Sequence, residues 1–142
     1  MESSLFYVPK RELEMKAIIL CIATAITMSA ASASDVSPNA NDGKAIFAAQ
    51  CSACHSVVPG QDDIGPNLSR VYGEKAANIP GYAFSPALKA AHIIWTSAAL
   101  KKFLLSPQMD VPGTKMPFMG MRSAIKRADI VAYLASLRRK GG

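Results

Sequence analysis

The sequence predicts an all-α protein of one domain, in which short helices are separated by long irregular segments. No segment alternates apolar and polar residues in the way that a half-buried strand does. The clearest helix covers residues 123–139, and its apolar stripe consists of Ile125, Ile130, Tyr133, Leu134 and Leu137. Segments rich in proline and glycine separate the weaker helix signals, and 142 residues suffice for one ordinary domain but not two.

Residues 1–33 are expected to be removed during export. Met15-Lys16 forms a short positive start, and residues 17–28 form an uncharged run of about 12 residues, too short to span a membrane. Ala31-Ser32-Ala33 has the small-residue pattern of a signal-peptidase site, so cleavage is expected after Ala33. Three glutamates upstream of Met15 do not suit an export signal, and we therefore take Met15 as the candidate start of translation.

The mature chain is expected to be a soluble, basic, periplasmic monomer with two cysteines. Cys21 leaves with the signal, and the residues before it lack the small side chains of a lipoprotein site, so Cys51 and Cys54 remain. The signal segment carries three basic and three acidic residues, so the net charge stays at +6. Such a charge favours acidic proteins, anionic lipid or nucleic acid as partners. No basic run interleaved with aromatics supports nucleic acid, and no membrane insertion is expected after cleavage.

Residues 34–40 are expected to be a flexible start, followed by the folded domain over residues 41–142. The first helix is expected to begin at Asn41 or Asp42, either of which can cap it. Its residues at helical spacing are Gly43, Ile46, Phe47 and Cys51. Turn-forming residues then predict loops over 58–69 and 78–81.

Three further helices are expected in the second half of the chain. Ser85-Pro86 places a proline at a favoured first position and predicts a short helix over 87–92. Thr96 or Ser97 caps the next helix, which ends at Ser106-Pro107 and buries Leu100, Phe103 and Leu104. Residues 110–121 are expected to be irregular. The last helix carries basic residues that suit its C-terminal dipole, namely Arg138, Arg139 and Lys140, and Gly141 ends it.

The segment Cys51-Ser52-Ala53-Cys54-His55 predicts a covalently attached haem. Two cysteines three residues apart at the end of a helix can reach both vinyl groups on one side of a porphyrin. The histidine that follows then lies under the iron as an axial ligand. A haem c bound through two thioethers also supplies the apolar volume that so few helices and so much loop require.

Three other readings of the two cysteines remain open at this point. A dithiol redox pair does not need His55 and usually lies at the start of a helix in a βαβ unit, which is absent here. A structural zinc site needs four ligands, and His92 is the only other histidine, at a spacing unlike that of zinc fingers. A disulfide across two residues would close a very small loop with little stabilisation.

Residues 41–139 resemble the class I c-type cytochromes, in the short soluble group of bacterial cytochrome c2 and mitochondrial cytochrome c. The matching segments are Gly43 with Phe47, Gly65-Pro66-Asn67-Leu68, Trp95, Pro112-Gly113-Thr114-Lys115-Met116, and Arg127-Ala128-Asp129-Ile130-Val131-Ala132-Tyr133-Leu134. The resemblance implies the cytochrome c fold wrapped around one haem. It also implies that the Pro66 carbonyl accepts the ring N–H of His55 and that Trp95 hydrogen-bonds a haem propionate.

The second axial ligand has five candidates: Met109, Met116, Met119, Met121 and His92. Any of the methionines could simply fill the core. Met116 is flanked by Pro112-Gly113 and Pro117, which would hold an extended segment against a haem face, and the family match falls on it. His92 has no loop around it that would deliver an imidazole to iron. His55 and Met116 are therefore the expected metal ligands.

Three positions depart from the family pattern. Phe103 replaces a tyrosine that hydrogen-bonds the methionine sulfur, Glu74 replaces an arginine near a propionate, and Leu88 replaces an asparagine that orders an internal water. We therefore expect the redox potential to depend more on burial than on the family's hydrogen-bond network.

The expected function is electron transfer in a bacterial respiratory or photosynthetic chain of the periplasm. With both axial positions filled, no open site is left for oxygen or peroxide, so no enzymatic activity is expected. The resemblance implies a docking face for acidic redox partners such as an oxidase, a reductase, a dehydrogenase, a bc1 complex or a reaction centre. Its candidate residues are Lys44, Lys101, Lys102, Lys115, Arg122 and Lys126. The alternatives are a haem enzyme or sensor with a labile methionine, and a haem-free module held by a disulfide or zinc.

Overall fold

The structure, a computed structural model, describes residues 37–140. The expected signal segment 1–33 and residues 34–36 lie outside the described residues. Within them the helices are α2 (Ala40–Gln50), α3 (Pro86–Ala90), α4 (Ser97–Leu105), α5 (Pro107–Asp110) and α6 (Ala124–Lys140). The only extended pairing between residues 37 and 140 is an isolated bridge between Lys75 and Ile94. The all-α prediction is therefore confirmed. None of the described helices combines the length and apolar character that a membrane crossing requires.

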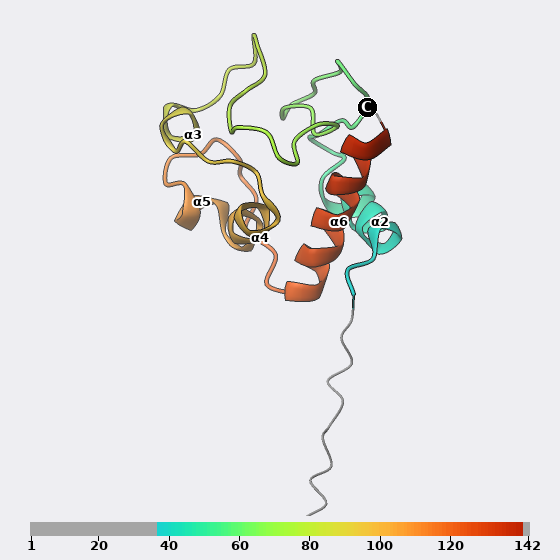
Figure 1. Ribbon diagram of the computed structural model, residues 1–142. Coiled ribbons are helices and arrows are strands. Elements are labelled where there is room, and N and C mark those ends of the chain that lie inside the picture. Colours follow the sequence, from blue (N-terminus) through green and yellow to red (C-terminus); the bar gives the residue numbers. More distant parts are fainter. Residues whose placement is uncertain (1–36, 141–142) are drawn as a thin grey trace, which may run out of the picture. The chain divides into compact units, whose positions relative to one another are not determined.

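The first and last described helices cross and pack against each other (Figure 1). A Cβ atom on Gly43 would collide with the backbone carbonyl oxygen of Asp129, so only glycine permits this approach. Beside the crossing, the rings of Phe47 and Tyr133 pack with centroids 5.6 Å apart. Ile130 is 1% exposed and lies at the centre of the core.

The start of α2 differs from the prediction. The cap is Asn39, whose side chain accepts a hydrogen bond from the Asn41 N–H at 2.9 Å, so neither Asn41 nor Asp42 caps the helix. The Asn39 N–H in turn donates to the buried Asp129 carboxylate at 2.8 Å. The contact with Asp129 of α6 therefore favours Asn39 as the cap. Because Asp129 is distant in the sequence, the local pattern around Asn39 could not predict this.

The cap of α4 and the proline at the start of α3 are as predicted, and Ser85 is the cap of α3. Ser85 accepts from the Leu88 N–H at 3.1 Å, and Thr96 accepts from the Ala99 N–H at 3.2 Å. The expected end of α3 at His92 is wrong, because His92 has a φ of +49° and cannot continue a right-handed helix. The buried face of α4 is confirmed; it consists of Leu100, Phe103 and Leu104.

The one-turn helix α5 was not predicted. A proline can occupy the first position of a helix, and Pro107 does so here instead of only ending α4. After Asp110 the chain is irregular up to Ser123, as expected.

The buried stripe of α6 is confirmed except at its start. Ile130, Tyr133 and Leu134 are buried, whereas Ile125 is 56% exposed. Ile125 lies in the first turn, where the chain from Arg122 to Lys126 is exposed throughout. Val131, which the predicted stripe did not include, is buried instead.

Candidate haem site

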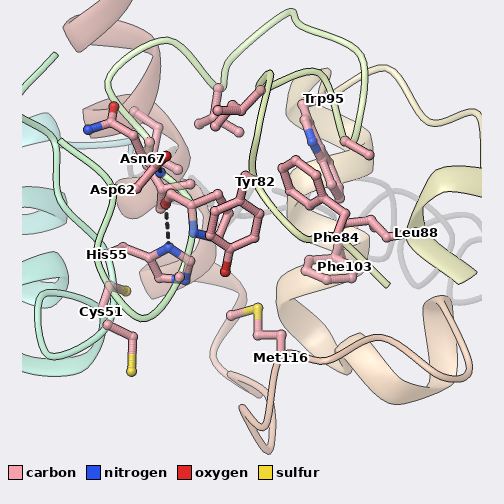
Figure 2. Close-up of a pocket in the computed structure, with 18 of the residues that line it drawn as sticks. Cys51, His55, Asp62, Asn67, Tyr82, Phe84, Leu88, Trp95, Phe103 and Met116 are labelled. Carbon is pink, nitrogen blue, oxygen red and sulfur yellow. Dashed lines mark hydrogen bonds between the residues drawn. The ribbon is translucent and has the colours of Figure 1, made fainter. Parts of the chain in front are cut away.

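A large cavity lies between the long loops and the helices (Figure 2). Its volume is about 980 Å³, at the upper end of the range for ligand pockets (roughly 300–1,000 Å³). All six residues that the sequence analysis assigned to the cofactor line it: Cys51, Cys54, His55, Pro66, Trp95 and Met116. Side chains of α4 and α6 close it from the core, including Leu100, Phe103, Leu104, Ile130 and Leu134.

The two cysteines follow directly after α2. The chain continues in tight turns, in which the N–H groups of Cys54 and His55 both donate to the Cys51 carbonyl, at 3.0 and 2.9 Å. Both thiols are free and half-buried. The turn therefore presents two thiols and an imidazole to the same cavity.

The chemistry of the Cys51 thiol disfavours a dithiol redox pair. Burial, assisted by the neighbouring Cys54, raises its pKa to about 11. A redox-active pair at the start of a helix works through a thiolate with a depressed pKa. Here the cysteine lies at the end of a helix and its pKa is shifted in the opposite direction.

The His55 ring is oriented by the loop that follows it. Its Nδ1 lies 2.8 Å from the carbonyl oxygen of Pro66 (Figure 2, dashed line). A carbonyl only accepts, so Nδ1 carries the proton and Nε2 keeps a free lone pair. Gly65 packs against the ring so closely that a Cβ there would lie 2.6 Å from Nδ1.

Asn67 stabilises the loop that carries Pro66. Its side-chain amide donates to the carbonyls of Val58 and Gln61, at 2.5 and 2.7 Å, and its oxygen accepts from the N–H of Ser69 at 2.8 Å. The backbone N–H of Asn67 also donates to Asp62 at 2.9 Å. These bonds replace the regular hydrogen bonds that the loop lacks and fix the carbonyl that His55 contacts.

Trp95 and Phe103 form an apolar wall. Trp95 is 7% exposed, and its ring meets Phe103 edge-on with centroids 5.0 Å apart. The backbone of Trp95 pairs with the 73–74 segment, since its N–H donates to the Glu74 carbonyl at 2.9 Å and its carbonyl accepts from Gly73 at 2.9 Å.

The five candidates for a second ligand are placed very differently. Met109 and Met119 are 82% and 93% exposed, His92 is also exposed, and none of the three lines the cavity. Met116 and Met121 do line it, and Met121 is almost completely buried. Geometry therefore reduces the five candidates to two.

All three departures from the family pattern lie on the cavity wall. Phe103 and Leu88 offer no hydrogen-bond donor there. The Glu74 carboxylate lies 3.7 Å from Arg138 of α6, whose guanidinium also donates to the Tyr72 carbonyl at 2.8 Å. Arg138 of α6 therefore lies next to Glu74, the position at which the family pattern has an arginine.

Among the cavity residues that the sequence did not indicate are two neighbouring aromatic rings. Tyr82 and Phe84 lie in the loop before α3, with ring centroids 4.6 Å apart, and both line the cavity. The Tyr82 hydroxyl donates to the Ile64 carbonyl at 2.8 Å and so joins two loops. Burial, then Asp62 and Cys54, raise the pKa of Tyr82. No periodic pattern marks this loop, so nothing in the sequence assigns either ring to the site.

The basic residues expected to form a docking face are all exposed. Two of them have partners, since Lys102 lies 2.5 Å from the Asp110 carboxylate and Lys115 donates to the Ala83 carbonyl at 3.0 Å. They lie in α2, in α4, around the start of α6 and in residues 114–120, which we call the Met116 segment.

The described residues do not support the alternative of a zinc site at the cysteines. Among residues 37–138 no group of three or more histidine, cysteine, aspartate or glutamate side chains could hold a metal ion. His92, the fourth group that such a site would need, is exposed and does not line the cavity.

Comparison with known proteins identifies the family. The cytochrome c family model matches residues 40–138. Cytochrome c of Euglena viridis is 43% identical over 100 residues, which cover 70% of this chain and 98% of the relative. Cytochrome c2 of Rhodomicrobium vannielii is 39% identical over 124 residues, covering 86% of this chain and 97% of the relative.

A solved structure shares both sequence and fold with this chain. Cytochrome cH from Methylobacterium extorquens superimposes with a TM-score of 0.65 at 43% identity, over 69% of this chain and 98% of that protein. Together with the cavity and its two thiols, these matches show that the chain belongs to the cytochrome c family, whose members bind one covalent haem c and act as electron carriers, not enzymes.

Proposed function

We propose that this electron carrier attaches its haem through Cys51 and Cys54 and coordinates the iron with His55 and Met116. The observation that carries the proposal is that these four side chains, from two segments some 60 residues apart, line one cavity. When bound, the haem supplies an iron that alternates between Fe(II) and Fe(III).

The described residues fit such a group. The cavity is large and mostly apolar, as a porphyrin requires, and both thiols border it without being paired to each other. His55 offers the lone pair of Nε2, because Nδ1 is held by Pro66. Trp95 lines the cavity, and its indole N–H is the group proposed to donate to a propionate.

Each polypeptide group has a distinct effect on the iron. The carbonyl of Pro66 fixes the His55 ring and raises its donor strength. As a ligand, the soft thioether of Met116 would favour the ferrous state and raise the potential. Held by both His55 and Met116, a bound haem iron would keep no vacant position for a small substrate and would supply outer-sphere electron transfer.

We further propose that the protein works in the periplasm and exchanges electrons with proteins that present acidic faces. The export signal expected over residues 15–33 supports the location, and the similarity to bacterial cytochromes c2 agrees with it. The net charge of +6 supports electrostatic attraction to such partners. Turnover with a given oxidase should then slow as ionic strength rises.

Spectroscopy of the ferric holoprotein tests the ligand assignment. Haem that stays with the polypeptide in acid–organic extraction establishes covalent attachment. Met116→Leu should abolish the weak red methionine–iron charge-transfer band and produce high-spin iron. Met121→Leu is the matched control, because Met121 also lines the cavity, and it should keep the band. Loss of the band in Met121→Leu, with its retention in Met116→Leu, would assign the ligand to Met121.

A further inference from the structure

The one-turn helix α5 is fixed to its surroundings at three points. Pro107 is buried to below 2% exposure. Asp110, almost fully buried, pairs with Lys102 of α4. The third point is Gln108, which lies between these two residues and faces the Met116 segment.

Gln108 holds two carbonyls of that segment with one amide group. Its Nε2 donates to the Thr114 carbonyl and to the Met116 carbonyl, both at 3.0 Å. The amide nitrogen carries two hydrogens, so both bonds can exist at once. The side chain therefore spans the turn on which Met116 lies.

Few other hydrogen bonds hold the Met116 segment in place. Among the described residues, no hydrogen bond between backbone groups involves residues 115–120. The N–H of Met116 reaches the Thr114 hydroxyl only at 3.4 Å. Lys115 donates to the Ala83 carbonyl through its long side chain. The next hydrogen bond between backbone groups is the one that the Met121 N–H donates to the Leu104 carbonyl at 2.8 Å.

We propose that Gln108 is a positioning residue that keeps the Met116 segment closed against the cavity, an inference that rests on Met116 being the axial ligand. An external ligand such as imidazole can reach the iron only when the thioether has left it. Its apparent affinity is then its intrinsic affinity multiplied by the fraction of molecules with the segment open. Removing the Gln108 bonds raises that fraction and leaves the intrinsic affinity of the iron unchanged.

Imidazole titration of the ferric holoprotein, followed by loss of the methionine–iron band, tests the proposal. Gln108→Ala should bind imidazole about three- to tenfold more tightly than the wild type, as expected for two partly exposed hydrogen bonds. Gln108→Glu should bind it more tightly still, because a carboxylate would face two carbonyl oxygens. Met109→Ala is the matched control on the same turn; Met109 is 82% exposed, and its variant should stay within about twofold of wild type.

The titration distinguishes a failure of the positioning role of Gln108 from a failure of Met116 as the iron ligand. Unchanged imidazole affinity in Gln108→Ala, with the band present in the wild type, would overturn the positioning role alone. An equal gain in Met109→Ala would also overturn it, because the effect would then be a general loosening of α5. A wild type without the band would instead contradict Met116 as the ligand.

Discussion

At the scale of single residues, the chemistry of the site could be predicted from the sequence because it is encoded locally. Cys51, Cys54 and His55 lie within five residues, so their spacing alone indicates haem attachment. Their orientation depends on residues that are distant in the sequence. The His55 ring contacts Gly65 and Pro66, and only the structure shows how tightly.

Replacing Gly65 should therefore disturb the iron without touching it directly. In Gly65→Ala the new Cβ would overlap with the His55 ring, displace it and lengthen its bond to Pro66. We expect a loss of about 1–3 kcal/mol in unfolding free energy and a changed midpoint potential, measured by denaturant titration and voltammetry. Gly81→Ala is the control: Gly81 does not line the cavity and its added Cβ would meet no neighbouring group within 4 Å, so strain at its φ of +81° should lower stability but leave the potential unchanged. An unaltered potential in Gly65→Ala would show that the ring tolerates the overlap.

Phe103→Tyr should shift the midpoint potential measurably. Phe103 borders the cavity beside Trp95, so a hydroxyl added there would lie against the haem site. Voltammetry of the holoprotein measures the shift. The conservative control is Phe103→Leu, which changes the packing but adds no donor and should move the potential less. Equal potentials in wild type and Phe103→Tyr would contradict the idea that the missing hydroxyl matters.

His92→Gly should stabilise the protein. His92 is exposed and has a φ of +49°, a conformation that costs an L-residue about 1–2 kcal/mol and glycine almost nothing. Glycine also increases the entropy of the unfolded chain, so a net gain of about 0.5 kcal/mol is expected in denaturant unfolding. His92→Ala keeps the strain and should show no gain. A destabilised His92→Gly would mean that the imidazole makes a favourable contact.

At the scale of elements, the sequence predicts a helix well where a capping residue and apolar periodicity coincide. The prediction fails where tertiary contacts determine the position of a helix end. Thr96 and Ser85 cap α4 and α3 as local patterns indicate. Asn39 caps α2 because Asp129 of α6 holds its N–H, and α5 forms on a proline that was taken only as a stop. The cavity-lining loop with Tyr82 has neither caps nor periodicity, so its rings could not be assigned.

Arg138 connects the end of α6 to the loop at Tyr72–Glu74, and removing it should loosen that side of the cavity. Arg138→Ala removes a bond to the Tyr72 carbonyl and an ion pair with Glu74, both partly exposed. We expect a loss of about 1 kcal/mol in unfolding free energy. Lys126→Ala, in an exposed first turn of the same helix, should change stability by less than about 0.5 kcal/mol. If both substitutions lower the unfolding free energy equally, the contacts of the Arg138 guanidinium do not stabilise the protein.

At the scale of the whole molecule, the cavity lies where the centre of the core would otherwise be. Residues of α4 and α6 that form the core, such as Leu100, Leu104 and Ile130, also line this space. Without haem they would face about 980 Å³ of unfilled volume. We therefore expect the cofactor to contribute to folding as well as to electron transfer.

The variant Cys51→Ala/Cys54→Ala should accordingly lose its cooperative thermal transition. Circular dichroism should show reduced helix content, because the core residues no longer have an apolar group to pack around. The single variant Cys54→Ala keeps one thioether and is expected to lie between the double variant and the wild type. A double variant that melts as sharply as the holoprotein would show that the polypeptide core is sufficient.

The crossing of α2 with α6 has a consequence for the order in which the molecule is made. Helix α2 can find its main partner only after the chain has been synthesised as far as α6, which begins at Ala124. Closing a loop of that length is slow relative to forming local helices. Until then the two thiols that follow α2 have no core around them. The delay therefore leaves an interval in which Cys51 and Cys54 stay accessible for the haem attachment that we propose for them.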